Sequence, residues 1–195
     1  MRIDYTALSD EELLKRFISG EKPAFERLLE KYRERVSQFI RWRLCELDCH
    51  AEDLAQEVFM DVYLKAAGFR FESSFRTWLY SVCANKCLNF RRSHFNNAGR
   101  AETSAVEEEE MLAIPDGEPC QLEALEEAER REIVGAAVEA LPAHFKETLL
   151  LRDWENLSYN EIAQVLDIPA GTVRSRLHNA RALLALELRR RYELP

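Results

Sequence analysis

The sequence predicts an all-α protein in which two helical units are joined by an acidic, flexible linker. Only six of the 195 residues are glycine and six are proline, and apolar residues recur at helical spacing in both halves of the chain. Acidic residues concentrate in the middle, since residues 98–132 carry 3 basic and 12 acidic side chains, a net charge of −9. Both ends are therefore close to neutral, and the overall charge of −8 does not exclude nucleic-acid binding by either end.

The N-terminal unit is predicted to span residues 8–95 as a helical bundle. Ser9 and Glu12 have the spacing of a capping box at the start of a short helix, and Pro23 suits the first turn of a longer one. A third helix is expected from about Ala51, and a fourth through the segment FRTWLYSVCANKCLNFRRS. The inner face of the third helix is predicted to consist of Leu54, Val58, Val62 and Tyr63.

Residues 96–130 are predicted to form the linker. The segment holds a run of four glutamates together with Pro115, Gly117 and Pro119, a composition typical of a solvated tether. Three apolar residues, Met111, Leu112 and Ile114, are available to dock on a partner.

The C-terminal unit, residues 131–190, shows the pattern of a helix-turn-helix. Ser158 and Glu161 form a second capping box before a short helix, residues 167–171 form a turn, and the last helix begins near Thr172. A short helix, a tight turn and a second helix with exposed arginines are typical of major-groove readers.

The last helix divides into an apolar and a cationic face. At 100° per residue, Val173, Leu177, Ala180 and Leu184 fall on the core side. Residues 170–192 carry 6 basic side chains and 1 acidic one. Arginine matches the guanine edge with two donors, so this face suits duplex DNA; an ordinary amphipathic helix with an arginine-rich polar side is the alternative. The residues predicted on the opposite, exposed arc are Arg174, Ser175, His178, Asn179 and Arg181, with Arg176 on a flank.

Three segments resemble parts of the sigma-70 family of transcription initiation factors. AEDLAQEVFMDVYLKA and FRFESSFRTWLYSVCANKCLNFRR resemble its region 2, and ALPAHFKETLLLRDWENLSYNEIAQVLDIPAGTVRSRLHNARALL resembles its region 4. The short acidic linker is similar to that of the extracytoplasmic-function (ECF) group. The resemblance implies a cytoplasmic, non-enzymatic protein that binds core RNA polymerase (the β′ clamp helices and the β subunit), promoter DNA and a cognate anti-sigma factor. It implies no cofactor, metal or small-molecule substrate.

The resemblance also carries residue roles. Core-polymerase contacts are implied for Asp53, Gln56, Glu57 and Phe59, where carboxylates stand beside an exposed aromatic ring. Contacts to the melted −10 element are implied for Phe69, Arg76, Tyr80, Asn85, Lys86 and Asn89. Contacts to the duplex −35 element are implied for Thr172, Arg174, Ser175, Arg176, His178 and Arg181. For an acidic linker, the resemblance implies a path near the polymerase active site, where a polyanion can mimic nucleic acid.

Two aromatic residues of the fourth predicted helix are expected to lie on different faces. We expect Trp78 to lie in the core, grouped with Phe75, and Tyr80 to point elsewhere and be free to act on DNA. Phe71 stands where the family commonly has glycine, and its poor access to positive φ predicts a reshaped base-reading loop. Asp167 stands at a second such glycine, and aspartate tolerates left-handed geometry well enough to keep the turn.

Two other functions remain open at this point. A stand-alone helix-turn-helix regulator would use only the C-terminal unit, leaving the Asp53–Phe59 motif unexplained. A thiol- or metal-sensing regulator would use Cys45, Cys49 and His50 together with Cys83 and Cys87, although the spacing is wider than in most zinc knuckles. An enzyme is disfavoured because the four histidines fall in no recognisable catalytic arrangement. No signal peptide or membrane span is expected.

Overall fold

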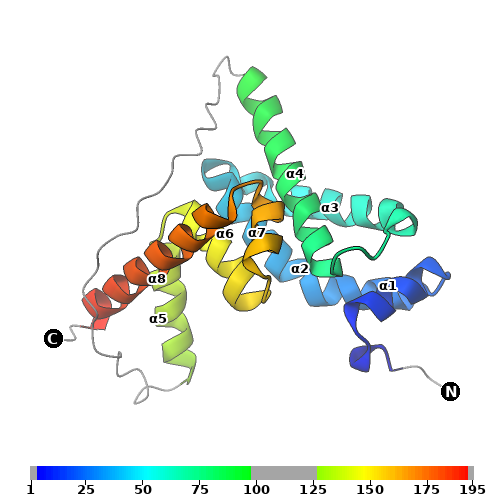
Figure 1. Cartoon of the computed structure of the whole chain (residues 1–195), viewed down its shortest axis with the longest axis horizontal. Coiled ribbons are helices and arrows are strands. Elements are labelled where there is room, and N and C mark those ends of the chain that lie inside the picture. Colours follow the sequence, from blue (N-terminus) through cyan, green and yellow to red (C-terminus); the bar gives the residue numbers. More distant parts are fainter. Residues whose placement is uncertain (1–3, 98–126, 193–195) are drawn as a thin grey trace. The chain divides into compact units, whose positions relative to one another are not determined.

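The computed structural model describes residues 4–97 and 127–192, which form helices and the turns between them (Figure 1). The predicted all-α class is confirmed. Residues 164–167 aside, the helices α1 to α4 belong to one compact unit and α5 to α8 to a second. Most of the predicted linker, including Met111, Leu112 and Ile114, lies outside the described residues.

The first unit contains α1 (Asp10–Ile18), α2 (Lys22–Leu44), α3 (Ala51–Lys65) and α4 (Phe75–Asn97). The predicted capping box is confirmed: the Ser9 amide donates to the Glu12 carboxylate at 2.9 Å, and the Glu12 amide donates to the Ser9 hydroxyl at 3.3 Å. Pro23 lies in the first turn of α2, as expected. Helix α3 begins at the expected Ala51, and α4 contains the whole of the predicted segment and extends to Asn97.

Packing in the first unit centres on α2, which contacts α1, α3 and α4. The core includes Leu13, Leu28, Val36, Ile40, Val58 and Val62. A buried carboxylate at Asp10 joins three elements: it accepts a hydrogen bond from Lys31 Nζ at 2.6 Å, accepts another from the Tyr32 hydroxyl, and lies 3.9 Å from Arg76 Nε. Because a buried charge is stable only when paired, this network fixes α1 against α2 and α4.

Three aromatic residues of the first unit differ from prediction. Tyr80 is fully buried and meets Phe39 of α2 edge-on, with ring centroids 5.2 Å apart, whereas Trp78 is only half-buried. The expectation that Trp78 lies in the core and that Tyr80 points away from it was therefore wrong. The reason is that α4 packs against α1, α2 and α3, so its buried arc is wider than an apolar stripe would indicate. Tyr63 is also partly exposed, with its ring against Phe17 and Phe25.

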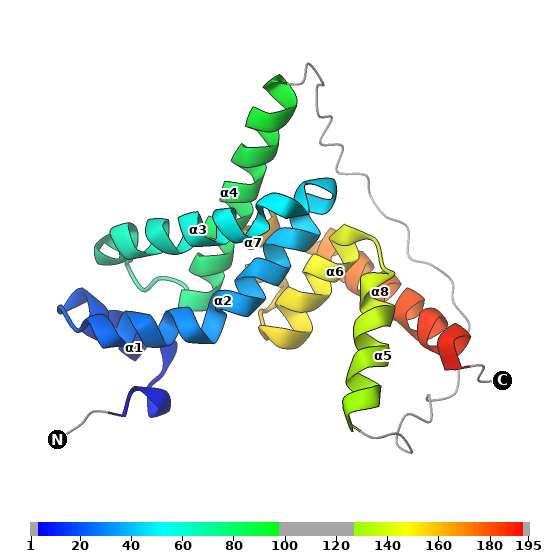
Figure 2. The same cartoon turned by 180° about the vertical axis from the view of Figure 1, so that it is seen from behind.

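The second unit contains α5 (Glu127–Glu139), α6 (Ala143–Leu149), a π-helical turn (Leu150–Trp154), α7 (Tyr159–Leu166) and α8 (Ala170–Tyr192) (Figure 2). The second capping box is confirmed, with the Ser158 amide donating to Glu161 at 2.8 Å. Asp167 takes a left-handed φ of 55° in the turn before α8, as its tolerance of that geometry predicted. Helix α8 begins two residues before Thr172 and packs against α5 and α6.

Among the described residues, no helix combines the length and the apolarity needed to cross a membrane.

Candidate nucleic-acid and protein interfaces

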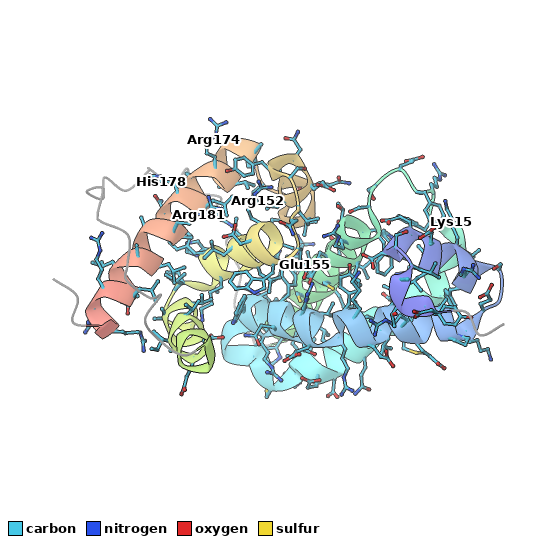
Figure 3. The ribbon with its side chains drawn as sticks, turned by 90° about the horizontal axis from the view of Figure 1, so that it is seen from below. Lys15, Arg152, Glu155, Arg174, His178 and Arg181 are labelled. Carbon is cyan, nitrogen blue, oxygen red and sulfur yellow. The ribbon has the colours of Figure 1, made fainter. Side chains whose placement is uncertain are left out.

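Two arginines and a histidine form an exposed stripe along α8. Arg174, His178 and Arg181 are separated by four and three residues, so they lie on one face, and all three are exposed (Figure 3). Opposite them, Val173, Leu177 and Ala180 are buried, which anchors the helix to its own unit. The stripe presents hydrogen-bond donors in the geometry that a major groove accepts.

The stripe is narrower than the sequence predicted. Thr172, Ser175 and Asn179 are buried, and the Ser175 hydroxyl donates to the Thr172 carbonyl at 3.0 Å. Arg176 is largely covered and lies 3.8 Å from the Glu147 carboxylate of α6. The expectation that Ser175 and Asn179 lie on the exposed arc of α8 was therefore wrong, and Thr172 and Arg176, implied for the −35 element, are buried or largely covered in this structure. Because α8 packs on two helices, α5 and α6, its buried arc extends well beyond the apolar stripe.

Arg181 already has a carboxylate partner. Its guanidinium donates to Asp153 of the π-helical turn at 2.7 Å, and both side chains are partly exposed, 51% and 39% respectively. An exposed pair of this kind contributes only about 0–1 kcal/mol, so a phosphate or a base edge can displace Asp153. The pair with Asp153 therefore leaves Arg181 available to DNA.

On α3, three of the four residues implied to contact polymerase form an exposed polar edge, and the fourth lines a groove between α2 and α3. Asp53, Gln56 and Glu57 are exposed, as expected. Phe59 is not: it is 7% exposed, because it packs inward with the α2–α3 core. It lines a groove of about 450 Å³ between these two helices, and Phe25, Leu29, Arg33, Met60 and Tyr63 are among the other lining residues.

Lys86, implied to contact the −10 element, is paired with acids of α3. Its ammonium lies 3.1 Å from Glu57 and 3.4 Å from Asp61. Burial lowers the pKa of Lys86, but the hydrogen bonds and charges of these two carboxylates outweigh burial and raise it. A hydrogen bond from Lys65 at 3.0 Å, helped by the charge of Lys86, lowers the pKa of Asp61. The structure therefore joins a polymerase-contact candidate to a DNA-contact candidate.

Of the other residues implied for the −10 element, Phe69 precedes α4, and Arg76, Asn85 and Asn89 lie on α4. Phe69 follows α3 and its ring lies 4.8 Å from that of Trp78. Arg76 is half-exposed beside Asp10, and Asn85 and Asn89 are both exposed, four residues apart on one helix face. The loop before α4 is fixed by a hydrogen bond from the Phe75 amide to Glu11 of α1, at 3.0 Å.

Phe71 adopts the geometry that its side chain disfavours. Its φ is +57°, so the loop keeps the left-handed backbone of a glycine despite carrying a bulky ring. The expectation that Phe71 reshapes the loop by avoiding positive φ was therefore wrong. Contacts of the ring with Phe69 and with Lys15 accompany this strained conformation.

The cysteines give little support to a sensor. Cys83 and Cys87 are buried free thiols in α4, and burial raises the pKa of Cys83 well above its ordinary value, which disfavours the reactive thiolate. Cys49 is exposed, and the Cys45 side chain lies outside the described residues. Within the described part of the chain, no three His, Cys, Asp or Glu side chains are placed to hold a metal ion.

Sequence reasoning missed several exposed or bridging residues. Met60 and Leu64 of α3 are 61% and 70% exposed, and their spacing of four residues on the outer side of the helix was the available signal. Lys15 and Asp153 gave no signal, because each acts through a partner distant in the chain.

Comparison with known families matches both units. The model of sigma-70 region 2 matches residues 28–95, and that of sigma-70 region 4 matches residues 131–184. The chain is 32% identical over 180 residues to the ECF RNA polymerase sigma-E factor of Escherichia coli K12, covering 89% of this chain and 91% of that protein. The protein of the same name in Haemophilus influenzae Rd is also 32% identical, with 91% and 94% covered.

Two solved structures share the fold. The sigma factor RpoE of Bartonella quintana, in complex with the anti-sigma factor NepR, aligns with a TM-score of 0.56 at 20% identity, covering 87% of this chain and 97% of that one. CnrH, in complex with the cytosolic domain of CnrY, aligns with a TM-score of 0.55 at 20% identity, covering 91% and 95%.

Proposed function

The chain belongs to the sigma-70 family and acts as an ECF sigma factor in transcription initiation, and we propose that its two units divide the promoter between them. The unit of α1 to α4 docks on core RNA polymerase and captures the melted −10 element. The unit of α5 to α8 reads the duplex −35 element. The protein works in the cytoplasm by binding alone, with no chemistry of its own.

The stripe of Arg174, His178 and Arg181 is the observation that carries the −35 assignment. These side chains are exposed on a helix that follows a capped helix and a tight turn, which is the arrangement that inserts a helix into the major groove. Thr172, Ser175 and Arg176 have a supporting role instead, because their burial or near-burial holds α8 in place.

Core polymerase docks on the polar edge and the groove of α3. Asp53, Gln56 and Glu57 offer two carboxylates and an amide to the clamp helices of β′, and Phe59 lies at the groove beside them. The exposed Met60 extends this surface with apolar area. A stand-alone DNA-binding regulator has no use for such a combination of charged edge and apolar groove.

A cognate anti-sigma factor is the second protein partner. RpoE of Bartonella quintana was solved with the anti-sigma factor NepR bound, and CnrH with the cytosolic domain of CnrY, which supports a protein partner of this kind here. Such a partner would compete with polymerase for the first unit or mask the second.

The test is run-off transcription with bacterial core polymerase, with and without this protein, on fragmented genomic DNA. We expect promoter-specific transcripts that need the added protein, and weak promoter binding by the free protein, since two weak DNA sites become strong only when polymerase fixes their separation. Tight, polymerase-independent binding to one duplex site, without new transcripts, would support the stand-alone regulator and contradict the proposal.

A further inference from the structure

Two histidines from different helical segments of the first unit meet beside one aromatic ring. His50 is the residue directly before α3, and His94 lies in the last turn of α4. Their ring centroids are 6.4 Å apart, and the ring planes make an angle of 55°. The centroid of the Phe90 ring lies 5.1 Å from that of His50 and 6.1 Å from that of His94. We call His50 and His94 the histidine pair.

The roles proposed above for polymerase and DNA involve neither of these histidines. The sequence singled out His50 as part of a sensor that also used cysteines, but two of those, Cys83 and Cys87, are buried in α4. The structure places His50 next to a second imidazole instead, from a part of the chain that is distant in sequence. A metal site on this side of the unit would therefore be built from nitrogen ligands.

Folding alone does not account for the histidine pair. His94 is exposed and His50 is half-buried, so both rings stay within reach of water and of solutes. His50 occupies the N-cap position of α3, yet its side chain makes no capping hydrogen bond. The side chains that stabilise a helix from this position are those of serine, threonine, aspartate and asparagine. Helix capping therefore gives no reason for a histidine here.

Two imidazoles at this separation suit a transition-metal ion. Neutral imidazole is a good ligand for zinc, with a Zn–N distance of about 2.0–2.1 Å. Two imidazoles on the same ion consequently have ring centroids about 5–6 Å apart. The observed 6.4 Å must shorten by only about an ångström, and the exposed side chain of His94 can supply this by rotation, since exposed rotamers interconvert readily. The Phe90 ring lies against both imidazoles as an apolar wall.

We propose that His50 and His94 bind one Zn²⁺ ion, which joins the start of α3 to the last turn of α4. The pair supplies two ligands and water completes the coordination, because in the described part of the chain no group of three His, Cys, Asp or Glu side chains could hold the ion. Structural zinc sites have four protein ligands, so this ion is exchangeable and is not needed for folding. The site does not depend on the proposed function.

The charges next to His50 are compatible with a bound cation. The positive end of the α3 dipole lies at His50 and opposes it. Glu52 and Asp53, in the first turn of the same helix, bring two carboxylates close to this end and offset the effect. Zinc bound here therefore lies beside Asp53, on the helix that also carries the candidate polymerase contacts.

The experiment titrates Zn²⁺ into the full chain under reducing conditions, followed by isothermal titration calorimetry. Mg²⁺ is the control ion, because it prefers oxygen ligands. His50→Gln and His94→Gln each remove one imidazole and keep a polar side chain. His144→Gln is the matched control, since the His144 ring also lies against a phenylalanine, with its centroid 4.1 Å from that of Phe145 in the second unit. All cysteines are retained, so zinc bound by thiols survives every substitution.

We expect wild type to bind one Zn²⁺ ion that depends on the histidine pair, and no Mg²⁺ there. His50→Gln and His94→Gln should each weaken this binding at least about tenfold, because losing a ligand costs no less than losing an outer-shell partner. His144→Gln should leave it unchanged. Zinc should raise the melting temperature of wild type, because an ion that binds the folded state stabilises it, and should slow amide exchange in the last turn of α4. The double variant should show neither effect.

Unchanged zinc affinity in either His50→Gln or His94→Gln overturns the proposal, because the two rings would then not act as one site. An equal loss in His144→Gln also overturns it, since zinc would be binding to histidines in general. The same holds if wild type binds zinc only through thiols, with an affinity that all three variants share. Run-off transcription is a separate measurement, so its failure would contradict the proposed function and leave this result standing.

Discussion

The two candidate DNA surfaces differ in how ready they are to bind. On α8, Arg174 and His178 are exposed on a helix that is anchored by its opposite face. In the first unit, Lys86 is engaged by Glu57 and Asp61, and Arg76 lies beside Asp10. The candidate duplex-reading stripe is therefore exposed on an anchored helix, with Arg181 paired to Asp153, whereas Lys86 and Arg76, the candidate cations for melted DNA, lie against acids of their own unit.

This difference fits the order of events at a promoter. Duplex DNA is present from the start, so a preformed surface loses nothing by being exposed. Unpaired bases appear only within the polymerase complex, and we expect the internal ion pairs of Lys86 to reduce premature binding of the single strand. Glu57 connects the two steps, because it is both a candidate polymerase contact and a partner of Lys86.

The largest expected effect is on the stability of the first unit. Tyr80→Ala removes a fully buried ring that contacts Phe39, and should lower the free energy of unfolding by about 3–5 kcal/mol. Trp78→Ala should cost clearly less, because Trp78 is half-buried. Chemical denaturation followed by circular dichroism measures both, and Tyr80→Phe, which keeps the ring, is the control. A larger loss for Trp78→Ala would restore the original assignment of Trp78 to the core.

Tyr80 and Ser175 show how much of this molecule could be predicted from the sequence. Helix bounds, both capping boxes and the core face of α8 follow from local patterns, because capping and periodicity are properties of neighbouring residues. The exposure of Tyr80 or Ser175 depends on how many helices pack around its own, which periodicity does not encode. Where α4 and α8 each meet two or more neighbours, the buried arc widens and polar or aromatic residues join it.

Long-range partners were equally hidden. Nothing near Lys15, Asp153 or Lys86 in the sequence indicates the groups they contact, because those groups lie on other elements. The sequence thus predicted which helices carry the candidate residues. Which side chains are exposed, and which are held by acids, required the tertiary structure.

The second prediction tests the preformed surface. Arg174→Ala should reduce discrimination between correct and altered −35 elements by about 1–3 kcal/mol if Arg174 contacts a base. Stability should stay within about 0.5 kcal/mol, because the side chain is exposed. Binding of holoenzyme to promoter variants measures the discrimination, and thermal unfolding measures the stability. Arg190→Ala, 80% exposed on the same helix and off the stripe, is the control. An equal loss on every sequence would assign Arg174 to a phosphate.

The third prediction tests the internally paired surface. Glu57→Gln combined with Asp61→Asn releases Lys86, and should tighten binding of an unpaired −10 oligonucleotide by the free protein about fivefold, close to the upper range of an exposed ion pair. Fluorescence anisotropy measures the affinity. Adding Lys86→Gln should cancel the gain. Glu26→Gln with Glu30→Gln removes the same charge from exposed sites on α2, and an equal gain there would mean a general charge effect.

The pH dependence of oligonucleotide binding distinguishes the titration of Asp61 from that of other groups. Lys65 and Lys86 lower its pKa, so the pairing is complete above the ordinary aspartate pKa and is lost only as the pH falls through the lowered value. Between about pH 5 and pH 8 the carboxylate stays ionised, and oligonucleotide binding should not change through this group. A rise in affinity over that range would report the titration of another side chain.

The smallest expected effect concerns Arg181 of the α8 stripe, which is paired with Asp153. Asp153→Asn releases Arg181 and should change stability by no more than about 0.5–1 kcal/mol, because both side chains are partly exposed. Binding to non-specific duplex should strengthen about two- to threefold, with a steeper salt dependence, since a free arginine gains a phosphate. Asp167→Asn removes another carboxylate, in the turn before α8, at a position where asparagine accepts the φ of 55°, and is the matched control. If both variants strengthen binding equally, Asp153 acts only through its charge; if Asp153→Asn alone does so, the ion pair restrains Arg181 until DNA replaces the carboxylate.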